Sequence, residues 1–210
     1  MRITLWSLAL TAALVACGGD SSEIGQESPT AVERTDEQAP DEYAVLFETS
    51  AGNFKIQATR AWAPHGADRF YALVTNGYFD DQRFFRVVPD FVVQWGLSGD
   101  PELTSQWRNA GIPDDEVAET NTRGRVTFAA TSLPDSRTTQ LFVNLGDNVK
   151  LGGTGFAPFG EVVEGMEIVD AINAEYREQP DQAEIGTRGN EYLNEDFPDL
   201  DYIVTASIAE

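Results

Sequence analysis

Apolar and polar residues alternate along much of the chain from Tyr43 onward, which is the pattern of strands that bury one face. The alternation is clear in YAVLFETS and NFKIQA, two segments joined at Ala51 and Gly52, and it predicts a β-hairpin. Six further strand-like segments follow: FFRVV, FVVQW, RVTFAA, QLFVNL, APFGEVV and DYIVTASI. Many short strands with few helices predict a mainly β fold that is closed into a barrel.

Two segments have helical spacing instead. The first begins at Pro64, repeats apolar residues at i, i+3, i+4 and i+7 between Ala67 and Val74, and ends before Gly77. The second is EGMEIVDAINAE, residues 164–175, whose apolar side chains are expected to face inward. Residues 175–199 contain several Gly and Pro residues and are predicted to form a long loop, with one turn of helix at NEYLN.

The first 42 residues do not have the pattern of a folded domain. Residues 1–16 contain Arg2 and the mostly apolar run ITLWSLALTAALVA, which is too short to span a bilayer and predicts a signal peptide. The run ends in LVAC and resembles a bacterial lipoprotein signal, in which Cys17 would be lipidated. Residues 18–42 hold eight acidic residues and one arginine with few large apolar side chains, so 17–42 is expected to be a lipidated cysteine followed by a disordered acidic tether.

Charge and composition restrict what the remaining residues, 43–210, can do. Hydrophobic residues make up 41% of the chain and charged residues 23%, which is ordinary for one globular domain. The formal net charge of the chain is −21, with 35 acidic residues against 14 lysines and arginines, which argues against an electrostatic nucleic-acid binder. Metal binding is also disfavoured, because there is one histidine and one cysteine.

The stretch RFFRVVPDFVVQWG, residues 83–96, carries the strongest candidate chemistry. Pro89 and Asp90 break the run, so the two halves are predicted to be antiparallel strands joined by a turn. Arg86 and Gln94 lie equally far from Asp90 and would face each other on one side of the sheet. A strand arginine in such a position is also compatible with a structural ion pair to a carboxylate.

The same stretch resembles the signature of cyclophilins, the peptidyl-prolyl cis-trans isomerases, in the spacing of its Phe, Arg, Pro, Phe and Gln. GRVTFAATSLPDSRTTQLFVNLGDN resembles the second block of the family, in which an alanine is followed eleven residues later by Gln and then Phe. FAPFGEVVEGMEIVDAI resembles the third block, and PHGADRFYALVTNGYFDDQRF fits the first helix and its exit. The likeness implies an eight-stranded antiparallel barrel capped by two helices, with the substrate groove on its outer face.

The resemblance also implies roles for individual residues. Arg86 matches the catalytic arginine of the family. The other matching positions imply substrate-binding roles for Phe91, Val92, Gln94, Ala129, Ala130, Gln140, Phe142 and Phe156. Val92 stands at a position that is often methionine, Phe156 where many members have histidine or tyrosine, and Ala130 where asparagine is common, so the pocket is expected to be apolar but altered in shape.

Prolyl isomerisation explains why such a site would contain an arginine. Amide resonance imposes a barrier of about 18–20 kcal/mol, and twisting the bond localises the lone pair on the prolyl nitrogen. Arg86 would remain charged and could donate a hydrogen bond to that nitrogen. No nucleophile, metal or cofactor is required.

Two classes of function follow. The first is a lipid-anchored isomerase that acts on proline-containing segments of unfolded or exported proteins in the bacterial periplasm, with no nucleic-acid partner and as a monomer. The second is a binding module of the same shape, a holdase or assembly scaffold, in which catalysis is incidental. The intact set of site residues favours the enzyme, and it disfavours a purely structural envelope lipoprotein. Gly18, rather than aspartate, follows Cys17, which favours the outer membrane.

Overall fold

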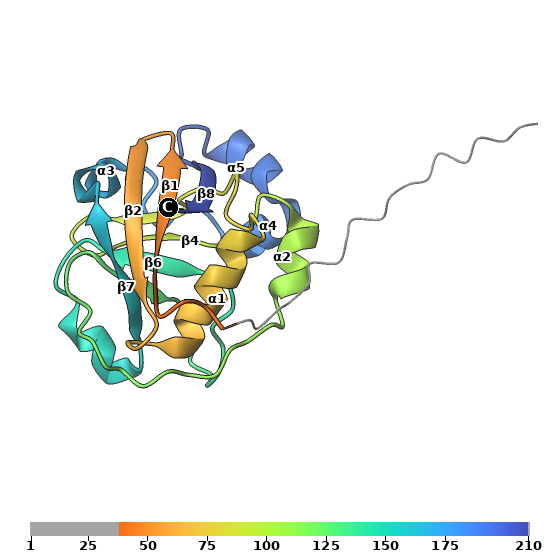
Figure 1. Ribbon diagram of the computed structural model, residues 1–210. Coiled ribbons are helices and arrows are strands. Elements are labelled where there is room, and N and C mark those ends of the chain that lie inside the picture. The colour runs from red at the N-terminus through yellow and green to blue at the C-terminus, as the bar shows by residue number, and fades with distance from the viewer. Residues whose placement is uncertain (1–37, 210) are drawn as a thin grey trace, which may run out of the picture. The chain divides into compact units, whose positions relative to one another are not determined.

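The computed structural model describes residues 38–209, and its strands form one antiparallel sheet in the order β3-β4-β6-β5-β7-β2-β1-β8. Figure 1 shows β1, β2 and β7 in front, with β4 and β6 crossing behind them, so the sheet curls strongly. All eight strands predicted from the alternating pattern are present. Their bounds are Glu42–Thr49, Gly52–Thr59, Arg86–Val88, Val92–Trp95, Arg125–Phe128, Leu141–Asn144, Pro158–Glu164 and Ile203–Ile208 for β1 to β8.

The prediction of a closed barrel is wrong in one respect, because the ladder is open between its edge strands β3 and β8. One isolated bridge, between Arg83 and Tyr202, joins the segments that precede these two strands. Hydrogen bonds from Phe84 N to Asp201 O (3.0 Å) and from Ile203 N to Gln82 O (2.8 Å) flank that bridge. The chain therefore approaches closure at one point but leaves β3 without a strand partner on its outer side.

Two short turns set the strand registers that matter most for the site. In the first hairpin, Thr49 pairs with Gly52, and Gly52 has φ +128°, a conformation that favours glycine. In the second, Phe91 N donates to Val88 O at 3.0 Å and Asp90 takes φ +61° after Pro89. The second turn pairs Arg86 with Gln94, which confirms the predicted register.

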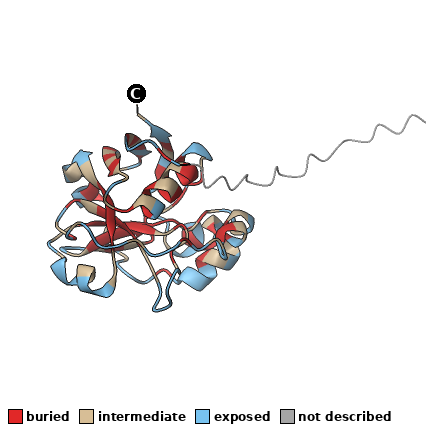
Figure 2. Ribbon diagram, turned by 60° about the horizontal axis from the view of Figure 1, so that its bottom comes forward, coloured by how far each residue is buried: buried red, intermediate tan, exposed pale blue. Residues whose placement is uncertain are grey.

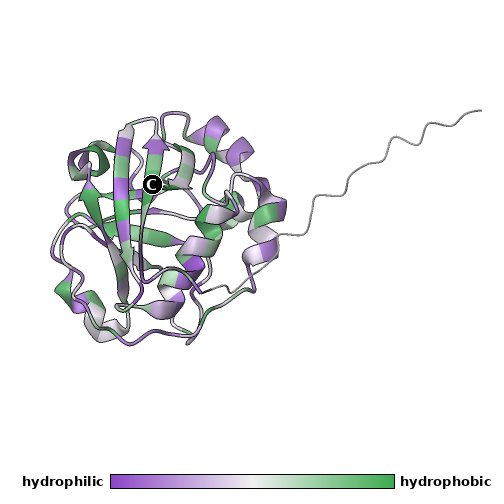
Figure 3. Ribbon diagram, in the orientation of Figure 1, coloured by the Kyte–Doolittle hydropathy of each residue, from purple (hydrophilic) through white to green (hydrophobic). Residues whose placement is uncertain are grey.

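An aromatic cluster fills the inside of the curled sheet. Phe47 and Phe54, on adjacent strands, stack with their ring centroids 4.9 Å apart, and Trp95 meets Phe47 edge-on at 5.6 Å. Trp95 is fully buried, and its neighbour Gln94 points the other way because side chains alternate along β4. Figure 2 shows the buried residues concentrated on the central strands, and Figure 3 shows alternating apolar and polar residues along β2.

Five α-helices and one 3-10 helix lie within residues 38–209, so the expectation of two helices was incomplete. The two predicted helices are α1, Pro64–Thr75, which contacts β7 and β8, and α3, Met166–Ala171, which contacts β2. The others are α2, Pro101–Trp107, the 3-10 helix η1, Val149–Thr154, and a pair between α3 and β8. Asp100 accepts a hydrogen bond from Glu102 N at 2.8 Å and so caps α2.

The segment predicted to be a long loop folds into two helices, α4, Gln182–Arg188, and α5, Asn190–Asp196. The predicted helical turn at NEYLN lies within α5, whereas α4 was missed. The pair packs beside β3 through a buried cluster that joins Phe85, the residue before β3, to Ile185, Tyr192, Leu193 and Leu200. We refer to residues 173–200, which include both helices, as the helical insertion. It covers the outer side of β3 that the sheet leaves without a strand partner.

The predicted signal peptide, Cys17 and most of the predicted tether lie outside the described residues. At the start of the described chain, Ala39 is buried and its N–H donates to Asp68 Oδ1 at 2.9 Å, so ordered contacts begin before β1. Within residues 38–209, no helix is long and apolar enough to cross a bilayer.

The buried cluster gives a test of how firmly the helical insertion is attached. Leu193 is 2% exposed, so Leu193→Ala should lower the free energy of unfolding by about 2–5 kcal/mol, through lost burial and the cavity left behind. Urea unfolding followed by tryptophan fluorescence measures this change. Leu133 is 69% exposed, and Leu133→Ala, the same substitution, should change it by less than about 0.5 kcal/mol. Equal effects of the two substitutions would contradict the packing described here.

Candidate functional site

A cavity of about 850 Å³ opens on the outer face of the sheet, beside β3, β4 and β6. All nine residues singled out from the sequence line it, although their roles stay predictions: Arg86, Phe91, Val92, Gln94, Ala129, Ala130, Gln140, Phe142 and Phe156. Residues from α2 and α4 form the opposite wall, which the sequence did not lead us to expect. The cavity is therefore a groove with two walls.

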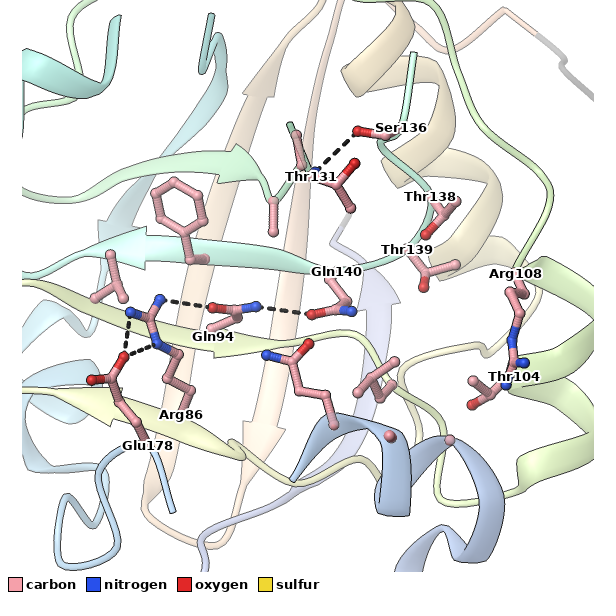
Figure 4. Close-up of a pocket in the computed structure, with 18 of the residues that line it drawn as sticks. Arg86, Gln94, Thr104, Arg108, Thr131, Ser136, Thr138, Thr139, Gln140 and Glu178 are labelled. Carbon is pink, nitrogen blue, oxygen red and sulfur yellow. Dashed lines mark hydrogen bonds and ion pairs between the residues drawn. The ribbon is translucent and has the colours of Figure 1, made fainter. Parts of the chain in front are cut away.

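A row of three polar side chains crosses the floor of the groove (Figure 4). Arg86 Nη1 donates to Gln94 Oε1 at 3.0 Å, and Gln94 Nε2 donates to Gln140 Oε1 at 2.9 Å. The row follows from strand pairing, because Arg86 lies opposite Gln94 and Gln94 lies opposite Phe142, two residues beyond Gln140. The amide of Gln94 thus has both ends occupied, whereas Gln140 Nε2 has no hydrogen bond within the described chain and can donate to a ligand.

Aromatic rings form the apolar part of the groove next to this row. Phe142 and Phe156 meet edge-on with centroids 5.9 Å apart, and the Arg86 guanidinium carbon lies 5.4 Å from the centre of the Phe91 ring. Val92, the first residue of β4, is buried and lines the same cavity. A cation beside aromatic faces can bind a segment that has both an apolar ring and a polar backbone.

A buried network of asparagine side chains, which sequence reasoning missed, binds the backbone carbonyls of Phe91 and Phe156. Asn148 Nδ2 donates to Phe91 O at 2.9 Å and to Asn144 Oδ1 at 2.8 Å. Asn121 Nδ2 donates to Phe156 O at 2.8 Å, and Asn121 Oδ1 accepts from Asn144 Nδ2 at 3.3 Å. Asn121 and Asn144 are fully buried. Because buried amides need partners, this network fixes the aromatic wall relative to the strands.

Gln140 is positioned by a close approach at the end of β4. Gly96 takes φ +113°, and a Cβ there would overlap the backbone oxygen of Thr139. Thr139 Oγ1 and Tyr78 Oη both donate to Gly96 O, at 2.8 and 3.2 Å. Burial raises the pKa of Tyr78, which keeps its hydroxyl protonated as a donor. The groove floor at Gln140 therefore depends on a glycine at position 96.

Glu178 is the second contributor that the sequence did not identify. Its Oε1 lies 2.7 Å from Arg86 Nε and 2.5 Å from Arg86 Nη2. The helical insertion brings it there, because Val87 N on the open side of β3 donates to Arg177 O at 3.0 Å. Arg177 has φ +50°, so the chain turns sharply just before Glu178. The ion pair that the sequence left open for Arg86 is thus present, and it lies inside the groove.

The guanidinium of Arg86 is restrained but keeps donor capacity. Of its five N–H groups, one on Nε and one on Nη2 face Glu178, and one on Nη1 is given to Gln94. One N–H on each terminal nitrogen is left for a ligand, and the side chain of Arg86 is 27% exposed. Within residues 38–209, no cluster of three His, Cys, Asp or Glu side chains has the geometry of a metal site.

Comparison with known proteins identifies the family of the chain. The family model described as cyclophilin type peptidyl-prolyl cis-trans isomerase/CLD matches residues 44–188. A peptidyl-prolyl cis-trans isomerase of Acinetobacter baylyi is 36% identical over 135 residues, which cover 61% of this chain and 70% of that protein. Peptidyl-prolyl cis-trans isomerase B of Escherichia coli is 29% identical over 168 residues, covering 76% of this chain and 95% of the relative.

Solved structures extend the likeness to the fold. A cyclophilin type peptidyl-prolyl cis-trans isomerase from Cryptosporidium parvum superposes with a TM-score of 0.60 at 20% identity, covering 80% of this chain and 98% of that one. Another structure of that protein was determined in the presence of the dipeptide Ala-Pro.

Proposed function

The chain belongs to the cyclophilin-type peptidyl-prolyl cis-trans isomerases, and on that premise we propose that its groove binds an Xaa-Pro segment of a polypeptide with Arg86 as the catalytic residue. One observation carries the assignment of the site. The nine residues that the family resemblance selects from separate parts of the sequence line one cavity, and the arginine among them keeps uncommitted donors. The enzyme needs no group that the chain lacks, because no covalent bond is formed or broken.

Arg86 would act by stabilising the twisted amide. As the Xaa-Pro bond rotates, resonance is lost and the prolyl nitrogen becomes a hydrogen-bond acceptor. A free N–H of Arg86 would donate to it only in that state, which is the condition for lowering the barrier rather than merely binding. A charge-assisted hydrogen bond contributes about 1.5–3 kcal/mol, or roughly 10- to 150-fold in rate.

The rest of the groove would supply the remaining stabilisation. Phe91, Phe142 and Phe156 can enclose the proline ring and exclude water from the amide, and Gln140 Nε2 can donate to a substrate carbonyl. A grip on both sides of the rotating bond favours the twisted geometry.

Replacing Arg86 tests its assignment. Arg86→Ala should lower kcat/KM for a proline tetrapeptide at least about tenfold, because the donor to the prolyl nitrogen is lost. An isomerisation assay measures this, and circular dichroism checks the fold. Arg188, which pairs with Glu195 on the surface and does not line the cavity, supplies the control Arg188→Ala, which should stay near wild type. Peptide binding without measurable turnover in the wild-type chain would instead favour the binding-module alternative.

Glu178 would serve as a positioning residue for Arg86. It holds the Nε edge of the guanidinium, while Gln94 holds Nη1, so the two contacts fix the plane of the group. A guanidinium fixed before the substrate arrives loses less side-chain entropy in the transition state. The helical insertion would thus contribute to catalysis through Arg86 rather than by touching the reacting bond.

A double-mutant cycle separates positioning from general structural support. Glu178→Gln should lower kcat about two- to fivefold with little change in KM, since a partly exposed ion pair becomes a neutral contact. In the Arg86→Ala background the same substitution should have no further effect, because the residue it acts through is absent. Glu184→Gln, an exposed change in α4 away from the cavity, is the matched control. A full additional loss in the double variant, or an increase in kcat, would contradict the role.

We further propose that the enzyme is anchored to the bacterial envelope through a lipidated Cys17 and assists the folding of exported proteins. The support lies in the sequence, in the short apolar run ending in LVAC and the acidic segment after it. A lipoprotein cysteine carries at least two acyl chains, enough for stable anchoring where one would give marginal binding. If residues 18–37 are flexible, these 20 residues would reach roughly 22–27 Å, so the groove would clear the lipid surface. Gly18 after the cysteine favours the outer membrane.

The anchor has its own test. Cys17→Ser should release or mislocalise the protein in fractionated cells while the isomerase activity of the folded part stays the same. Immunoblots of membrane and soluble fractions, with mass spectrometry of the amino terminus, measure the outcome. Wild-type protein that is soluble in the periplasm and has no lipid mass would rule out the anchor and leave a secretory signal.

A further inference from the structure

We propose that the end of the groove between α2 and α4 is a subsite for an acidic side chain of the bound polypeptide, with Arg108 as its ion-pair partner. The inference rests on the proposed function and names a substrate class for the same site. It concerns the wall of the groove that contains none of the residues singled out by the family resemblance. That wall is formed by Thr104 and Arg108 on one side and by Gln182, Gly186 and Thr187 on the other. Figure 4 shows Arg108 at the opposite end of the groove from Arg86.

The balance of charge in the groove carries the argument. Three ionised side chains line the cavity, and two of them, Arg86 and Glu178, neutralise each other at one end. The third, Arg108, has no carboxylate within ion-pair distance anywhere in residues 38–209. The groove therefore has one uncompensated positive charge, although the chain as a whole has 35 acidic residues and 14 lysines and arginines. An acidic ligand group is the natural complement.

The surroundings of Arg108 leave room for such a group. Gly186 lies in the middle of α4, where glycine costs about 1 kcal/mol relative to alanine. A Cβ at that position would come within 3.5 Å of Arg108 Nη2, so a side chain larger than alanine would press on the guanidinium. The hydroxyls of Thr104 and Thr187 at this end of the groove already donate to backbone oxygens, of Ser98 at 3.3 Å and of Ala183 and Glu184 at 3.1 Å each, so the guanidinium of Arg108 is the group left to donate to a carboxylate.

A simpler role for Arg108 predicts a different result. Arg108 is the residue at the carboxyl end of α2, where a cation complements the helix dipole. That role affects the stability of a seven-residue helix and is indifferent to the substrate. Only a subsite makes the rate depend on the charge of the peptide.

The spacing of the groove sets where the acidic residue belongs. The row from Arg86 through Gln94 to Gln140 crosses two strand intervals, about 10 Å, and Arg108 lies beyond it. An extended chain advances about 3.3 Å per residue, so the acidic side chain should stand three or more positions from the proline. The direction along the peptide is decided by experiment.

The test uses the full chain in detergent micelles and paired peptides that differ by one residue, Glu or Gln, scanned from two to five positions on either side of Xaa-Pro. At one position three or more residues away, kcat/KM should be about two- to fivefold higher for Glu than for Gln. The preference should shrink between about 20 and 300 mM salt, because the pair is exposed to solvent.

Charge substitutions provide the second arm. Arg108→Gln should bring the ratio of kcat/KM for the Glu and Gln peptides to about one. Arg108→Glu should bring that ratio below one, and a peptide with Lys at the same position should then be the preferred substrate. Lys55→Gln makes the same change in net charge as Arg108→Gln, but on β2 and outside the cavity, and should keep the wild-type ratio. If only the melting temperature moves in the Arg108 variants while the ratio stays, the helix-end role is the right one and the subsite is refuted.

The readouts also separate this inference from the proposed function. Active enzyme with a Glu/Gln ratio of one at every position, with no salt dependence, overturns the acidic subsite and leaves the isomerase assignment standing. If no peptide is turned over, the affinities of the same pairs, measured by isothermal titration, take the place of kcat/KM. Equal affinities then refute the subsite, and a Glu preference lost in Arg108→Gln supports it without catalysis.

Discussion

The pairing of Arg86 with Gln94 across the β3–β4 turn is the contact on which the groove depends. Pro89 and Asp90 make that turn, and a shift of one residue would send Arg86 and Gln94 to the aromatic core and Trp95 to the groove. Because Trp95 packs against Phe47, Phe54 and Phe84, the core resists such a shift. The alternation of side chains that buries Trp95 in the core therefore points Gln94, and Arg86 opposite it, into the groove. A substitution that loosens the packing of Trp95 should also disturb the geometry of the site.

An open edge in the sheet explains why the helical insertion reaches the site. β3 is three residues long and has a strand partner on one side only, so its other side needs hydrogen-bond acceptors and a covering layer. The insertion supplies both, with Arg177 O for Val87 N and the cluster around Tyr192 and Leu193 for Phe85. Covering the edge places Glu178 against the guanidinium and α4 along the groove. The helical insertion that covers the edge strand thus also forms part of the second wall of the groove and contributes the charge of Glu178.

Most of the fold was accessible from local patterns, and the exceptions have identifiable causes. The eight strands and the helices α1 and α3 follow from their hydrophobic periods, which local side chains determine. α2 and α4 were missed although Asp100 and Asp181 cap them, because PELTSQW has only two large apolar residues and QAEIGTR only one, too few to show a helical period. Closure was overestimated, because whether the two edges of a sheet meet depends on accumulated twist and on what fills the gap.

For the site, the resemblance of the sequence to cyclophilins singled out nine residues that line one cavity, since those residues stand in short motifs whose spacing is fixed by strands and turns. The sequence by itself also determined the charge of the chain and the candidate anchor at Cys17. Only the tertiary structure decided that Glu178 meets Arg86, 92 residues earlier in the chain, and that Arg108 shares the groove without a carboxylate partner in the described chain. Such contacts join segments that are distant in sequence, and their geometry depends on how the helical insertion docks on β3, which no local pattern of residues encodes.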